Sequence, residues 1–117
     1  MLSLVLAGAW LFGWTAPVAA AEVMQVRSAS LLLVGDSNRT YTVELACIRS
    51  SIEQQPQALD WLRQQLPRRS RVNLRPLGNR DGVLLVRVQK LGAPGDLSQG
   101  LIEAGLAQAT DQPSGCL

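Results

Sequence analysis

The chain of 117 residues contains no histidine. Without an imidazole group, it cannot use Ser–His or Cys–His catalysis, histidine general acid–base chemistry or a metal site with a histidine ligand. Aromatic residues are also scarce, at 4% of the chain, and beyond residue 21 only Tyr41 and Trp61 remain. The sequence therefore offers few rings for stacking on nucleic-acid bases.

Charge is absent from the first 21 residues, in which Leu2–Trp14 is an apolar run. Pro17 and then Val-Ala-Ala-Ala at 18–21 follow this run, and small residues there are typical of a signal-peptidase site. We expect a signal peptide over residues 1–21, cleavage near Ala20 or Ala21, and export to the periplasm or medium. The alternative is an uncleaved membrane anchor, although the run is short for a span of ~20 residues. After cleavage no stable membrane span is expected.

Cysteine is limited to Cys47 and Cys116. In an exported chain an even number of cysteines favours one disulfide. Closing the intervening loop would stabilise the fold by ~4 kcal/mol in the chain-entropy model. Two free thiols, with Cys47 as a small core residue, are the alternative.

Alternating apolar and polar residues predict strands over 22–34, 41–48, 71–77 and 83–91. Turn residues at 35–39 and 79–82 predict two hairpins. An apolar stripe with three- and four-residue spacing predicts a helix over 53–66, with Pro56 in its first turn and Pro67 at its end. A shorter helix is expected to begin at Asp96 or Ser98 and to end at Gly105.

This order of elements predicts a mainly β fold with α-helices, an α+β domain over residues 22–109. The expected architecture is a small five-stranded Greek-key barrel of the OB-fold type, with one main helix and one short C-terminal helix. Four strands are evident, and the fifth comes from division of the long first strand or from the chain near Tyr41. The polar tail 110–117 is expected to be ordered only if Cys116 ties it down.

Three blocks of sequence resemble the staphylococcal-nuclease-like (thermonuclease) family. Residues 43–52 read Val-Glu-Leu-Ala-Cys-Ile-Arg-Ser-Ser-Ile, where the family typically has Val-Arg-Leu-Ala-Gly-Ile-Asp-Ala-Pro-Glu. Residues 97–107 read Leu-Ser-Gln-Gly-Leu-Ile-Glu-Ala-Gly-Leu-Ala, where the family has Val-Asn-x-x-Leu-Val-x-x-Gly-Leu-Ala. The third block is Arg71-Val72-Asn73-Leu74 followed by Asn79-Arg80-Asp81-Gly82-Val83, where the family has Asp-x-Tyr-Gly-Arg. The resemblance also implies a disulfide between a cysteine in the active-site strand and one in a Ser-Gly-Cys run, here Ser114-Gly115-Cys116.

The resemblance implies a phosphodiesterase site with one Ca²⁺, a glutamate general base and two arginines that neutralise the phosphoryl oxygens. In this chain each of these functional groups is replaced. By this resemblance Ser28, Ser30 and Arg49 stand at the metal-binding positions. Glu44 and Val83 stand at the first and second arginine positions, and Ile52 at the general-base position. These six are called the degenerate active-site positions. We therefore expect no catalytic residues, no bound metal and no cofactor. Glu44 and Arg49 are hypothesised to pair as a salt bridge, and a site shifted in register would use Glu53 and Arg80 but still lack calcium ligands.

The sequence thus predicts an exported, monomeric nuclease homologue that is catalytically inactive and acts as a binding or structural module. Its ligand would be a protein or a nucleic acid. Possible polyanion contacts form a basic stretch comprising Arg63, Arg68, Arg69, Arg71, Arg75 and Arg80. The alternative is a solvated polar rim that keeps a small domain soluble. The alternative function is a divergent calcium-dependent nuclease acting on DNA or RNA.

Overall fold

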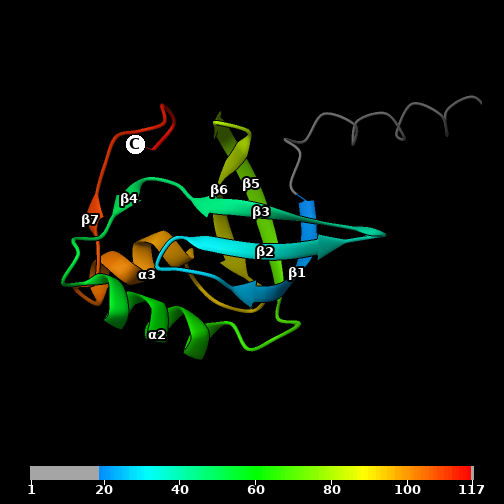
Figure 1. Ribbon diagram of the computed structural model, residues 1–117, viewed down its shortest axis with the longest axis horizontal. Coiled ribbons are helices and arrows are strands. Elements are labelled where there is room, and N and C mark those ends of the chain that lie inside the picture. The colour runs from blue at the N-terminus through cyan, green and yellow to red at the C-terminus, as the bar shows by residue number, and fades with distance from the viewer. Residues whose placement is uncertain (1–18, 117) are drawn as a thin grey trace, which may run out of the picture.

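Five strands curl into a closed barrel in the computed structural model, which describes residues 19–116 (Figure 1). The barrel strands are β1 (Ala19–Val26), β2 (Leu31–Asp36), β3 (Arg39–Leu45), β5 (Arg71–Arg80) and β6 (Val83–Lys90). Their order around the barrel is β1-β2-β3-β6-β5, and β1 pairs with β5 to close it. Only the β3–β6 pair is parallel among the barrel strands, with Val43 opposite Leu84. The expected small α+β barrel of the OB type is confirmed.

Aliphatic side chains at alternate strand positions fill the barrel interior, as the two-residue period of the sequence predicts. Ten of them are at most 4% exposed: Val23, Val26, Leu32, Val34, Val43, Leu45, Val72, Leu74, Val86 and Val88. Each such burial stabilises the fold by roughly 1.5–3 kcal/mol before the entropy cost of ordering the chain. A small second cluster of Ala46, Cys47 and Leu85 lies at the end of β3.

The long first strand expected over 22–34 is divided into β1 and β2, which supplies the fifth strand. The division falls at Ser28, whose hydroxyl accepts hydrogen bonds from the backbone N–H groups of Ser30 and Leu31 at 3.2 and 3.1 Å. A serine hydroxyl that accepts hydrogen bonds from backbone N–H groups of its own loop favours a turn over a continuous strand.

The hairpin between β5 and β6 turns at Asp81 and Gly82, whose φ values are 52° and 84°. Positive φ at both central residues matches the right-handed twist of the flanking strands. The Asn79 side chain accepts a 3.0 Å hydrogen bond from the Gly82 N–H. The sequence therefore predicted the turn correctly, although β5 continues to Arg80, three residues beyond the expected end.

Two helices, α2 (Gln55–Gln65) and α3 (Leu97–Glu103), lie together at one end of the barrel (Figure 1). Helix α2 lies between β3 and β5 in the chain, so it belongs to the connection between the third and fourth barrel strands. Asp96 caps α3 by accepting a 2.8 Å hydrogen bond from Gln99 N–H, and Gly105 has the expected positive φ of 75°. In the described part of the chain, neither helix is long and apolar enough to cross a membrane.

Two short strands were not predicted. Strands β4 (Ile48–Arg49) and β7 (Gln108–Ala109) form a separate antiparallel pair beside the barrel. The Cys47–Cys116 disulfide then fixes the C-terminal tail, which confirms the expected pairing. Residues 1–18 of the expected signal peptide lie outside the described residues, whereas residues 19–21 belong to β1.

Candidate functional site

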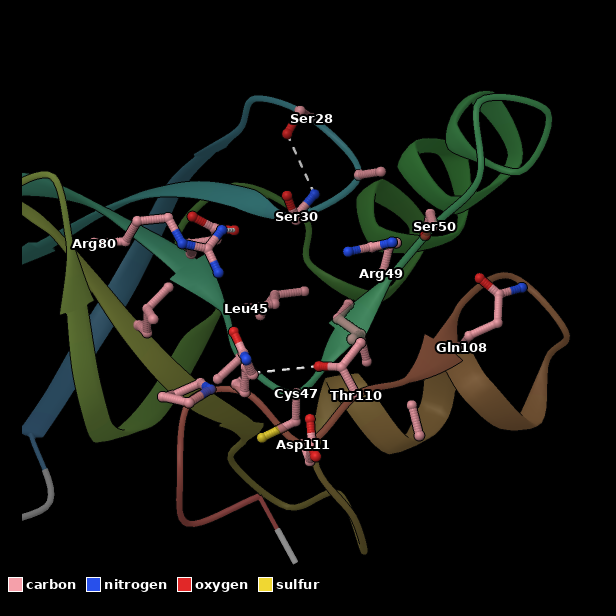
Figure 2. A pocket seen from close by; sticks show the side chains of 18 of the residues that line it. Ser28, Ser30, Leu45, Cys47, Arg49, Ser50, Arg80, Gln108, Thr110 and Asp111 are labelled. Carbon is pink, nitrogen blue, oxygen red and sulfur yellow. Dashed lines mark hydrogen bonds and ion pairs between the residues drawn. The ribbon is translucent and has the colours of Figure 1, made fainter.

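A pocket of about 760 Å³ opens where β3 leaves the barrel (Figure 2). Its wall is built from the β1–β2 loop (28–30), the end of β3 with β4 (44–50) and the tail (108–113). Gln55, Arg80 and Leu85 complete it. This volume is typical of a small-molecule or side-chain binding site.

Four of the six degenerate active-site positions line this pocket: Ser28, Ser30, Glu44 and Arg49. The other two do not. Ile52 is 81% exposed just before α2, and Val83 begins β6 opposite Arg80, which does line the pocket. The structure therefore gathers the expected metal-binding positions and the first arginine position in one pocket, whereas the general-base and second-arginine positions are not among its lining residues.

Glu44 does not pair with Arg49, so that hypothesis is wrong. Its carboxylate instead accepts a 3.1 Å hydrogen bond from Arg80 Nη1, and these groups form an ion pair. Arg80 stands at the end of β5 and reaches across β6, because β6 lies between β3 and β5 in the barrel. Since the Glu44 and Arg80 side chains are 23% and 55% exposed, the pair adds at most about 1 kcal/mol to stability.

Arg49 is held at its base by backbone pairing of β4 with β7, where it stands opposite Gln108. The neighbouring Ser50 hydroxyl donates a 2.7 Å hydrogen bond to the Leu106 carbonyl, which fixes the chain beyond β4. Figure 2 shows the Arg49 side chain extending on the side of the pocket where Ser30 lies. Among residues 19–116, Arg49 takes part in none of the ion pairs.

The tail forms one wall of the pocket, which sequence reasoning missed. Thr110 N–H donates a 2.9 Å hydrogen bond to the Cys47 carbonyl, and Arg87 Nη2 donates a 3.2 Å bond to the Cys116 carbonyl. Arg87 is also paired with Asp96 at 2.7 Å. The only signal in the sequence was the expected Cys47–Cys116 disulfide, which implied that the tail returns to the end of β3.

Cys47 itself adopts a positive φ of 73°, a conformation that favours glycine. The chain turns here from β3 into β4, and the residue is only 4% exposed. The resemblance described above places a glycine at this position, so the backbone requirement is met by cysteine at some conformational cost.

The described residues contain no group of three or more His, Cys, Asp or Glu side chains that could hold a metal ion. The pocket includes two carboxylates, Glu44 and Asp111, and the first is already paired with Arg80. Calcium usually takes six to eight oxygen ligands. These side chains therefore do not form a calcium site.

The six arginines of the basic stretch lie in different parts of the surface and do not form one patch around the pocket. Arg80 lines the pocket, whereas Arg71 lines a second hollow beside the β2–β3 hairpin and Arg68 a third. Two more of these arginines have partners of their own. Arg63 donates a 3.3 Å hydrogen bond to the Val26 carbonyl, and Arg69 lies 3.5 Å from Glu22; Arg75 is exposed on β5.

A cluster around Tyr41 lies away from the pocket, on the β2–β3 hairpin. The Tyr41 hydroxyl donates a 2.8 Å hydrogen bond to Asp36, and the Arg39 guanidinium lies 5.0 Å from the centre of the tyrosine ring. Burial, followed by the hydrogen bond and charge of Asp36, raises the pKa of Tyr41 above 10.0. The neutral phenol is thus the form that the fold favours.

Neither the protein-family models nor the curated proteins include a match to this chain. Membership of the staphylococcal-nuclease-like family is therefore a proposal that rests on the sequence blocks and the barrel.

Proposed function

We propose that this chain is an exported, non-catalytic binding domain built on a nuclease-like barrel, with its ligand site in the pocket at the end of β3. One observation carries the proposal. The structure holds a pocket of about 760 Å³ at these positions, while Glu44 is paired with Arg80 and the expected metal-binding positions carry Ser28, Ser30 and Arg49.

The chemistry of these side chains favours binding over hydrolysis. Phosphodiester cleavage requires an activated water and positive charge on the phosphoryl oxygens, and losing one such stabilising contact typically costs 10²–10³ in rate. Here Arg80 is neutralised by Glu44, and Ile52 at the expected general-base position is 81% exposed and cannot accept a proton. A ligand can still be bound, because binding needs only complementary contacts.

Export is supported by the disulfide. The Cys47–Cys116 bond joins residues 69 positions apart and holds a tail that otherwise has few buried apolar contacts. Such bonds persist in oxidising compartments and are rare in reducing ones.

The test is a cleavage assay with plasmid DNA and with RNA, in calcium and in a chelator. We expect no cleavage in either condition, with an active nuclease as the positive control. The matched control is Arg80→Gln purified in parallel, which reveals contaminating nucleases because a shifted site would use Arg80. Calcium-dependent cleavage by the purified chain that is lost in Arg80→Gln would establish the alternative, a divergent nuclease.

A further inference from the structure

Two exposed, charged side chains in the pocket have no ion-pair partner in the described part of the chain. Of the four ionised side chains that line it, Glu44 and Arg80 pair with each other, whereas Arg49 and Asp111 take part in none of the ion pairs among residues 19–116. They come from different segments, Arg49 from β4 and Asp111 from the tail after β7. In Figure 2, Arg49 lies on the side of Ser30 and Asp111 on the side of Cys47.

We propose that the pocket binds a peptide segment that carries both charges, with a carboxylate on Arg49 and an ammonium or guanidinium group on Asp111. This inference rests on the proposed binding function and names its ligand class. The planar Arg49 guanidinium can hold a carboxylate through two parallel hydrogen bonds, and Asp111 accepts hydrogen bonds from a basic group. The remaining wall includes aliphatic side chains, among them Ile48 and Leu85, which suit the apolar parts of a peptide.

A nucleic acid fits the same pocket less well. None of the residues that line it is aromatic, so no base can stack there. Two arginines and two acidic residues leave the lining with no net charge, and Asp111 repels a phosphate backbone. A ligand with separated positive and negative groups meets both free charges, whereas a polyanion meets only one.

The experiment displays random peptides on phage and selects them against the immobilised, disulfide-bonded full chain. We expect wild type to enrich peptides with an acidic and a basic residue at a fixed separation. Arg49→Gln should abolish the acidic preference and weaken a selected peptide roughly tenfold or more, and Asp111→Asn should do the same for the basic preference. Arg75→Gln and Asp60→Asn, both exposed and outside the pocket, are the matched controls and should bind as wild type does.

A charge-swapped chain, Arg49→Asp with Asp111→Arg, gives an independent readout because it should select peptides with the order of charges reversed. Thermal melting of each variant checks that it is folded. Failure to enrich charged peptides would overturn the inference, as would Arg49-dependent retention of an oligothymidine probe in place of peptides. These outcomes leave the non-catalytic assignment standing, whereas calcium-dependent cleavage in the nuclease assay would remove that assignment itself.

Discussion

Ser98 is the one polar residue among the buried side chains of the described chain, and its hydroxyl donates a 2.8 Å hydrogen bond to the Ala46 carbonyl. It joins the first turn of α3 to the end of β3, next to Cys47 and the pocket. Ser98→Ala leaves that carbonyl buried without this partner, so we expect a loss of about 1–3 kcal/mol in the free energy of unfolding. Urea denaturation measures it. Ser114→Ala, which removes an exposed hydroxyl, is the control and should change stability by less than about 0.5 kcal/mol.

Titration of the single side chain of Tyr41 should make the stability of the fold depend on pH. Because the pKa of Tyr41 is raised above 10.0 in the fold, its contribution to stability is complete below about pH 10 and is lost as the pH rises through the folded pKa. The melting temperature of wild type should therefore fall more steeply above that pH than that of Tyr41→Phe. Tyr41 is the only tyrosine in the chain, so ultraviolet absorbance of the phenolate reports its titration alone. A midpoint at or below 10.0 would contradict the described burial and hydrogen bond.

At the scale of elements, the contact between α2 and α3 depends on the absence of a side chain at Gly100. A Cβ atom there would lie 2.7 Å from Trp61 Cη2, closer than carbon atoms can pack. Alanine favours a helix by about 1 kcal/mol over glycine, but overpacking costs about 1–3 kcal/mol. We expect Gly100→Ala to destabilise the fold, as measured by urea denaturation. The matched control is Gly95→Ala, where nothing lies within 4 Å. Combination with Trp61→Leu should recover part of the loss, and additive effects would argue against this contact.

Helices and strands were predictable where they are long enough for the spacing of apolar residues to repeat several times. Strands such as β3 and β6, and helix α2, have repeating apolar positions, and turn residues separate them. Strands β4 and β7 have two residues each, which is too short for any period, so they became visible only as a pair. The end of β5 was missed because the pairing with β6 shifts register between Pro76 and Gly78, where alternation breaks down.

At the scale of the whole molecule, the disulfide holds the tail against the barrel and completes the pocket. Cys116→Ser should lower the free energy of unfolding by about 2–5 kcal/mol. Hydrogen exchange should rise in residues 108–113, whereas the β1–β2–β3 strands should stay protected. Binding of a peptide selected on wild type should weaken in the same variant.

Cys47→Gly is the companion variant, because it removes the same bond but relieves the positive φ at residue 47, and should therefore be the less destabilised of the two. Unchanged exchange in the tail would show that other contacts hold it.

The candidate site was only partly predictable, because its side chains come from distant parts of the sequence and meet only when the barrel forms. Sequence comparison identified Glu44 and Arg49 as altered positions, but the partner of Glu44 is Arg80, 36 residues away on a strand that is not its neighbour. Asp111 lies in a polar tail without any periodic pattern, and the Cys47–Cys116 bond, the β4–β7 pairing and the Thr110–Cys47 hydrogen bond bring it to the pocket.

Barrel closure between β1 and β5 depends on the first residues that the structure describes. In the antiparallel β1–β5 pairing, Ala19, Ala20 and Ala21 lie opposite Leu74, Asn73 and Val72. The pairing continues with Glu22 opposite Arg71, and Val23 forms backbone hydrogen bonds with Arg69 and Ser70. A chain beginning at Glu22 would leave three positions of β5 as a bare sheet edge, the kind of surface through which β proteins aggregate or recruit a neighbour's strand. Analytical ultracentrifugation of chains starting at residue 19 and at residue 22 should show self-association in the second only. Whether Ala19, Ala20 and Ala21 are retained would then decide whether the chain stays monomeric or self-associates.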